Sequence, residues 1–263
     1  MGAVRTGKGA IGVIESGGGT AVPIVFLHGV GSDKSVWRPQ LAHFGQCRRA
    51  IAFDYPGYGE SKFAAGASRD DFAAAILAAM DAVDIGRAHI CGLSLGGVIA
   101  IAMHATATDR CASLILADSF AVHPDGAGIF ERSTAASRSM TMGALAEARV
   151  AALLGNEASL ELREEVVATM GAIDPEAYRI GAEAVWLADQ RDRAAAIGVP
   201  TLVLCGDEDR ITPPALSEEL ARLVPGSQLE LIAAAGHLAN AEQPVAFNRA
   251  IDRFLTDVER NFP

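Results

Sequence analysis

Ser94 is the side chain of this sequence whose surroundings most directly suggest a catalytic role. It lies between Gly92 and Gly96 in the sequence GLSLGG, which spans residues 92–97. The residues before it are apolar and strand-like, and small residues typical of a helix follow. A serine in such a strand–turn–helix context matches a nucleophile elbow, in which the tight turn leaves no room for side chains at the flanking glycines. The alternative is a glycine-rich turn in which the serine only caps the helix.

A serine hydroxyl is a weak nucleophile unless a base takes its proton. His237 is the candidate base because it follows an expected strand at residues 229–233. A carboxylate must in turn orient the imidazole and stabilise its charged form. The candidate acids are Asp207 and Asp209, which share one loop, and Asp118 at the end of another expected strand. An ordinary turn carboxylate is the competing interpretation for each.

Acyl transfer also needs donors for the oxyanion that forms during attack. The sequence HGVG, residues 28–31, follows an apolar run and would turn its backbone amides toward Ser94. The expected donors are the backbone N–H groups of Val30 and Leu95. His28 is expected to organise this loop rather than to take part in catalysis.

The apolar runs that would position these residues alternate with longer helical patterns. Runs that are apolar on both faces suit a mostly parallel central sheet flanked by helices, which predicts an α/β fold. The runs lie at residues 23–28, 50–54, 88–92, 113–118, 201–206 and 229–233.

The interval between the fourth and fifth of these runs is much longer than an ordinary crossover. Helical patterns within it, at residues 142–155, 159–172 and 174–196, indicate a subdomain rather than a loop. We therefore predict a core of residues 1–119 and 199–263, with a helical subdomain of residues 120–198 above the ligand-binding edge of the sheet.

Side chains of this predicted subdomain and its surroundings are candidates for contact with a substrate. The candidate pocket residues are Trp37, Phe120, Met140 and Trp186. An anionic substrate would need a cation, for which the candidates are Arg132, Arg138, Arg149 and Arg179. Packing within the subdomain, or exposure to solvent for the arginines, is the alternative for every one of them.

Composition narrows the class of partner. The net charge of −10 argues against nucleic acid, which needs a basic face. No apolar run reaches the length of a membrane-spanning helix, so no membrane partner is expected. The four cysteines show no metal-ligand spacing, which predicts reduced thiols in the cytoplasm and no metal site. A small-molecule substrate remains the expected partner, and the oligomeric state, including a homo-oligomer, stays open.

Taken together, the motifs resemble the α/β-hydrolase superfamily. The matching segments are HGVG, DYPGYGES, GLSLGG, PTLVLCGDEDRITPP and GHLANAEQP. The order Ser94, acid, His237 is also the order of that superfamily. Its acid commonly stands third after a glycine, and Gly206 places Asp209 there. The resemblance further implies the α/β-hydrolase fold with a helical cap inserted after the sixth strand.

Within the superfamily, the chain is most similar to 3-oxoadipate enol-lactonases. This resemblance implies a serine hydrolase without a cofactor that cleaves a small carboxylic ester or lactone through an acyl-enzyme, with 3-oxoadipate enol-lactone as one substrate to test. Carbon–carbon bond hydrolases and cofactor-free haloperoxidases share many of the motifs and remain alternatives. A ligand-binding receptor built on a hydrolase scaffold is the non-enzymatic alternative.

Overall fold

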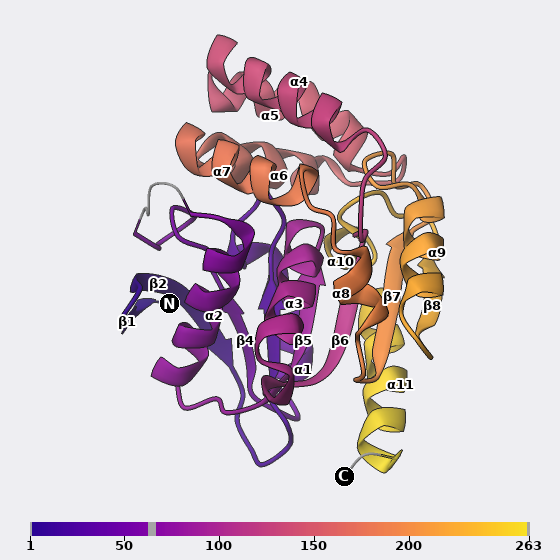
Figure 1. Ribbon diagram of the computed structural model, residues 1–263. Coiled ribbons are helices and arrows are strands. Elements are labelled where there is room, and N and C mark those ends of the chain that lie inside the picture. Colours follow the sequence, from indigo (N-terminus) through magenta and orange to yellow (C-terminus); the bar gives the residue numbers. More distant parts are fainter. Residues whose placement is uncertain (1, 63–66, 262–263) are drawn as a thin grey trace.

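The computed structural model, which describes residues 2–62 and 67–261, contains one eight-stranded sheet flanked by helices (Figure 1). The strand order is β1-β2-β4-β3-β5-β6-β7-β8, and the strands from β3 to β8 run parallel to one another. The mostly parallel α/β sheet predicted from the sequence is therefore confirmed. The strands are β1 (Gly2–Thr6), β2 (Gly9–Ser16), β3 (Ile24–Leu27), β4 (Ala50–Phe53), β5 (Ala88–Leu93), β6 (Cys111–Ala117), β7 (Thr201–Gly206) and β8 (Gln228–Ile232).

The central strands form the core because their side chains are buried on both faces. Every residue of β3, β4, β5, β6 and β7 is buried, as expected for strands covered by helices. Helix α2 packs on α3, and α1 packs on α11. The helices of the sheet layer are α1 (Arg38–Phe44), α2 (Arg69–Ala82), α3 (Leu95–Thr106), α8 (Arg191–Ala195), α9 (Pro214–Leu223), α10 (Ala239–Glu242) and α11 (Pro244–Asn261), and a 3₁₀ turn, η1, spans Lys34–Trp37.

The N-terminal strands β1 and β2 were not anticipated. They form an antiparallel hairpin, and β2 extends the sheet by pairing antiparallel with β4. Gly12 interrupts β2, and the residues of β1 alternate between half-buried and exposed. An edge hairpin of this kind has no continuous apolar run, which is the signal that identified the central strands.

Of the five helices between β6 and β7, the first four lie above the sheet in Figure 1, and we call these four the inserted helices. Thr141, Ser159 and Asp174 cap the last three by accepting hydrogen bonds from backbone N–H groups of the first turn. Only the first of the four had no helical pattern singled out in the sequence. The inserted helices are α4 (Gly126–Ser139), α5 (Met142–Leu153), α6 (Leu160–Gly171) and α7 (Pro175–Trp186).

The short helix α8 follows the inserted helices but contacts α3 and α9 of the sheet layer. Just before it, the Gln190 side chain donates a 2.7 Å hydrogen bond to the carbonyl oxygen of Val98 in α3. The division into residues 1–119 with 199–263, and 120–198, stays a prediction. Among the helices of the described residues, none is both long and apolar enough to cross a membrane.

Candidate active site

Ser94 lies at the junction of β5 and α3 in a strained backbone conformation. Its φ of 56° and ψ of −114° are unusual for a residue with a side chain. A Cβ on Gly92 would lie 2.1 Å from the carbonyl oxygen of Gly96, and one on Gly96 would lie 2.1 Å from that of Leu27. The side chain of Ser94 makes no capping hydrogen bond to the helix. The geometry is therefore that of an elbow and not of a helix cap.

His237 and Asp209 form a buried pair. Nδ1 of His237 lies 2.8 Å from Oδ2 of Asp209. The same carboxylate accepts hydrogen bonds from the backbone N–H groups of Ile211 and Thr212 and from the Thr212 hydroxyl. Burial raises the pKa of Asp209, but the charge of His237 and the hydrogen bonds from His237 and Thr212 outweigh it, and the net pKa is lowered. An ionised Asp209 holds Nδ1 and leaves Nε2 for a nucleophile.

The two alternative acids have different surroundings. Asp207 is exposed. Asp118 is buried with a φ of 47°, and its Oδ1 accepts a 2.8 Å hydrogen bond from the backbone N–H of Gly206. Its Oδ2 has no hydrogen-bond partner among the described residues. Burial, and then the charge of Asp209, hold the pKa of Asp118 well above its usual range, which favours the protonated form of this carboxyl. Of the three, only Asp209 contacts His237.

The HGVG loop runs directly against the elbow. A Cβ on Gly29 would lie 3.4 Å from the Cβ of Ser94. Val30 follows and lines the same cavity as Ser94, while Leu95 is the first residue of α3. The first N–H groups of a helix have no partner within it, which leaves the Leu95 amide available to a ligand.

His28 is a structural residue of this loop. It is fully buried, its Nδ1 donates to the carbonyl oxygen of Gly29 at 2.8 Å, and its Nε2 accepts from the backbone N–H of Tyr55 at 3.4 Å. Burial lowers its pKa, so the ring is neutral. Both nitrogens are engaged with the backbone, in agreement with the organising role expected from the sequence.

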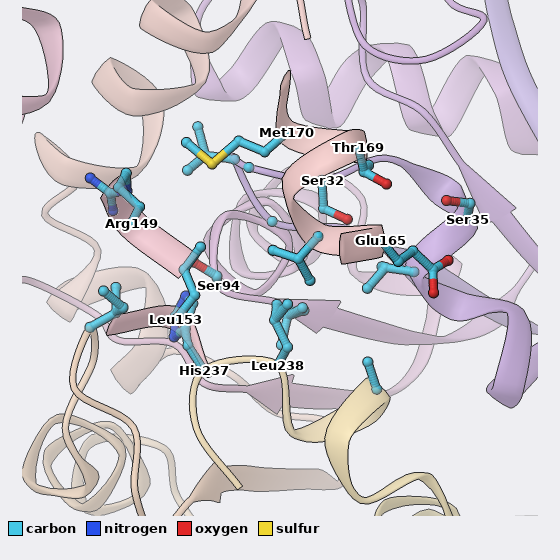
Figure 2. A pocket seen from close by; sticks show the side chains of 18 of the residues that line it. Ser32, Ser35, Ser94, Arg149, Leu153, Glu165, Thr169, Met170, His237 and Leu238 are labelled. Atoms are coloured by element: carbon cyan, nitrogen blue, oxygen red, sulfur yellow. The ribbon is translucent and has the colours of Figure 1, made fainter. Parts of the chain in front are cut away.

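Ser94 and His237 line one cavity of about 280 Å³ between the sheet layer and the inserted helices (Figure 2). Most of its surface is apolar. In Figure 2, Arg149 lies on the same side of the cavity as Ser94 and His237, and Glu165 lies on the other side. The apolar lining includes Val36, Leu153, Leu162, Val166, Met170 and Leu238.

The structure corrects three of the four predicted pocket residues. Trp186 lines the cavity, but Trp37, Phe120 and Met140 do not. Trp37 is fully buried in the core, where its ring stacks on Phe26 at 4.9 Å. Phe120 is buried behind Trp186 at a ring distance of 5.8 Å, and Met140 is 41 % exposed at the end of α4.

Four arginines were candidates for contact with an anion, and the structure separates them. Arg132 forms an ion pair with Asp125, and Arg179 forms one with Glu176. Arg138 is exposed and lies outside the cavity lining. Arg149 is half-buried, lines the cavity and has no ion-pair partner among the described residues. The sequence alone could not select it, because the facing of α5 depends on how the inserted helices pack.

Other cavity residues escaped notice in the sequence. Leu153, Met170 and Leu238 line the cavity, and an ion pair at 3.2 Å between Arg38 and Glu165 joins α1 to α6 at its far side. Apolar residues on a helix show the same sequence pattern whether they line a pocket or pack in the core, so the sequence could not identify these residues as part of the cavity.

One buried cluster has the composition of a metal site. Ligand atoms of Asp118, Cys205 and Asp209 lie within 4.8 Å of one another. Burial raises the pKa of both the Asp118 carboxyl and the Cys205 thiol, which favours their protonated forms, and the Asp209 carboxylate is engaged by His237 and Thr212. A metal ion would have to displace two protons and several hydrogen bonds, so we assign none here.

With sheet, elbow and histidine–acid pair in place, the class of protein is defined: the chain belongs to the alpha/beta hydrolase fold family, whose model matches residues 22–244. It is similar in sequence to 3-oxoadipate enol-lactonase 1 of Acinetobacter baylyi, with 27% identity over 257 residues that cover 97% of this chain and 96% of the relative.

Solved structures agree with this placement. The enol-lactonase from Burkholderia xenovorans LB400 superposes with a TM-score of 0.90 and 27% identity, covering 97% of this chain and 99% of that one. A thermophilic esterase from Thermogutta terrifontis superposes with a TM-score of 0.89 and 29% identity, covering 97% and 98%. The similarity to these enzymes supports the assignment of this chain as a hydrolase.

Proposed function

We propose that this protein is a serine hydrolase that cleaves a small carboxylic ester or lactone through an acyl-enzyme. The observation that carries the proposal is the combination of an uncapped, strained Ser94 with the Asp209–His237 pair on one cavity. Ser94 is the nucleophile, His237 the general base and Asp209 the orienting acid. The inserted helices act as a cap over the cavity.

In the proposed mechanism, Nε2 of His237 takes the proton of Ser94 as the hydroxyl attacks the carbonyl carbon. The backbone N–H groups of Val30 and Leu95 stabilise the oxyanion. The imidazolium then gives its proton to the leaving oxygen, which for a lactone stays attached to the acyl group. Water, activated by the same histidine, releases the acid and restores Ser94. Asp209 stabilises the imidazolium in both steps.

The cavity favours a small substrate that carries a negative charge. A volume of about 280 Å³ with a mostly apolar lining suits a compact ester or lactone. Arg149 supplies a cation on the side of the cavity where Ser94 and His237 lie, although the chain as a whole, at −10, gives an anion no long-range attraction. Enol-lactonases are among the similar proteins, and 3-oxoadipate enol-lactone bears a carboxylate that could pair with Arg149. It is therefore the first substrate to test.

The test is turnover by the wild type and by Ser94→Ala on p-nitrophenyl esters, simple lactones and 3-oxoadipate enol-lactone. Loss of the nucleophile should lower kcat on the order of 10⁵-fold or more, because the remaining groups cannot replace covalent attack. A serine-directed fluorophosphonate should label the wild type and not the variant.

The variant should unfold at nearly the wild-type temperature, which serves as the control for folding. Retained turnover in Ser94→Ala would contradict the assignment of the nucleophile. A wild type that neither reacts with the phosphonate nor turns over any ester would favour a ligand-binding receptor instead.

A further inference from the structure

The loop that carries His237 is held by hydrogen bonds that converge from two directions. The backbone N–H of His237 itself donates a 2.8 Å hydrogen bond to the carbonyl oxygen of Leu153, at the end of α5. The N–H groups on either side, those of Gly236 and Leu238, donate to Oε1 of Glu242 at 2.9 and 3.3 Å. All three amides of this stretch are thus occupied.

Glu242 also reaches the inserted helices. Its second oxygen, Oε2, accepts a 2.7 Å hydrogen bond from the backbone N–H of Gly155, in the connection between α5 and α6. One carboxylate therefore joins the histidine loop to the inserted helices, with a different oxygen facing each side. Glu242 is half-buried, so water competes less for these bonds than at the surface.

The two backbones that Glu242 joins are in direct contact. A Cβ on Gly236 would lie 2.5 Å from the backbone nitrogen of Gly155 and 2.9 Å from the carbonyl oxygen of Leu153. A Cβ on Gly155 would lie 3.0 Å from both Oε2 of Glu242 and the nitrogen of Gly236. The close approach requires glycine at position 236 and leaves little room for a side chain at position 155, so the histidine loop packs tightly against the α5–α6 connection.

We propose that Glu242 is a positioning residue for His237: its carboxylate fixes the histidine loop against the α5–α6 connection and so holds the imidazole within reach of Ser94. This inference rests on the proposed function, in which His237 is the general base. The inserted helices then do more than cover the cavity, because Leu153 and Gly155 help to place the base. A misplacement of about 1 Å in such a group can cost on the order of 100-fold in rate.

Glu242→Gln tests this, because an amide has only one acceptor oxygen and must lose the bonds on one side. The expected result is a fall in kcat of about tenfold on a p-nitrophenyl ester, with KM changed less than about twofold. The rate of labelling by a fluorophosphonate should fall by a similar factor, since it also depends on His237 as base.

Glu208→Gln is the matched control. Glu208 is also half-buried, and its Oε2 accepts a 2.7 Å hydrogen bond from the backbone N–H of Asn156 in the same connection. Its side chain does not bond to the residues flanking His237. The control should lose a comparable amount of thermal stability and keep kcat within about twofold of the wild type. An equal loss of kcat in both variants would overturn the proposal.

A double-variant cycle separates positioning from a purely structural role. In the His237→Ala background, Glu242→Gln should leave the residual turnover unchanged, because there is no imidazole left to position. A further loss of the same factor in that background would overturn the proposal, as would wild-type kcat in folded Glu242→Gln. If Glu242→Gln yields no folded protein, Glu242→Asp, which is one methylene shorter, takes its place in each comparison.

Failure of this inference can be told apart from failure of the proposed function. If Ser94→Ala turns over esters as well as the wild type does, the proposed function fails, and the positioning role that rests on it is overturned with it. If Ser94→Ala is inactive while Glu242→Gln retains full kcat, only the positioning role fails.

Discussion

Asp118 and Asp209 are two buried carboxyl groups whose surroundings shift their pKa values in opposite directions. The pKa of Asp209 is lowered because His237 and Thr212 donate to it, whereas Asp118 has one backbone donor and, among the described residues, no partner for its second oxygen. Environments that drive two carboxyl groups apart commonly mark a division of roles in an active site. Here they assign the orienting role to the ionised group.

Asp209→Asn and Asp118→Asn should therefore behave differently. The first removes the charge that orients His237 and should lower kcat on the order of 10³- to 10⁴-fold. Asp118→Asn should leave kcat near the wild-type value. Steady-state kinetics measures kcat for both variants. A loss in Asp118→Asn as large as that in Asp209→Asn would transfer the acid role to Asp118.

Asp118→Asn should also raise the free energy of unfolding of the protein at neutral pH. The folded-state pKa of Asp118 is raised, so its contribution to stability is fully present below the unfolded pKa of about 3.9 and is lost as the pH rises toward the folded value. An amide escapes that loss and can still accept from Gly206. Urea unfolding at pH 7 should show a higher midpoint for the variant, and an unchanged midpoint would mean that Asp118 is ionised without penalty.

The position of Arg149 in the cavity lining predicts that this residue recognises a negatively charged substrate. Arg149→Ala should raise KM for an ester with a free carboxylate, such as p-nitrophenyl hydrogen succinate, by about tenfold or more, since charge-assisted hydrogen bonds contribute about 1.5–3 kcal/mol. KM for the neutral p-nitrophenyl butyrate should stay within about twofold. Arg138→Ala, which removes an exposed arginine of α4, is the matched control and should alter neither value. Equal changes on both substrates in Arg149→Ala would contradict charge recognition.

At the scale of elements, the elbow depends on its glycines because the surrounding backbone leaves no room for a side chain at their positions. Gly92→Ala would place a methyl group 2.1 Å from the Gly96 carbonyl oxygen, so β5 or α3 must shift. Such overpacking against backbone should cost about 2 kcal/mol or more in the free energy of unfolding. Gly143→Ala, in α5 where a Cβ meets nothing within 4 Å, should instead stabilise by up to about 1 kcal/mol. Chemical denaturation measures both, and equal effects would contradict the close packing of the elbow.

The elements that could be predicted from the sequence are those with a local signal. The six parallel strands appeared as apolar runs because they are buried in the middle of the sheet, and Ser94 and His237 could be placed because each follows one of those strands. Asp209 also follows a strand, but only the resemblance to α/β-hydrolases favoured it over Asp207 and Asp118. Helix α4 was missed because it has few apolar side chains, and the β1–β2 hairpin because glycines interrupt it. Pocket residues could not be predicted with the same success, as the two tryptophans show. Trp37 lies in the core and Trp186 lines the cavity, and only tertiary packing determines this difference.

At the scale of the whole molecule, His89 ties the sheet to the C-terminal helix. Its Nδ1 lies 2.8 Å from the Ser113 hydroxyl, and its Nε2 lies 3.4 Å from Oε1 of Glu259 in α11. Burial first, and then the positive charge of Arg48, lower the pKa of His89 to about 4, although Glu259 acts in the opposite direction. The ring is therefore neutral in the folded protein down to mildly acidic pH.

The stability should consequently fall in acid. Because the folded pKa of His89 is depressed, its contribution is present above the unfolded pKa of about 6.5 and is lost as the pH falls toward about 4. In that window the unfolded chain binds a proton that the folded chain does not, at about 1.4 kcal/mol per pH unit. Urea unfolding at several pH values should show a flatter profile for His89→Gln than for the wild type. Parallel profiles would show that His89 titrates normally.

The cavity draws the proposed catalytic residues and part of its apolar wall from separate stretches of the chain. Ser94, Asp209 and His237 belong to connections that follow β5, β7 and β8, whereas Leu162, Val166 and Met170 belong to α6 and pair with no strand. Natural selection can thus exchange wall residues of α6 and alter substrate range while the sheet and the reacting groups stay intact. Outside the Leu153–Gly155 connection, the inserted helices are where descendants of this chain can diverge in specificity and retain a common chemistry.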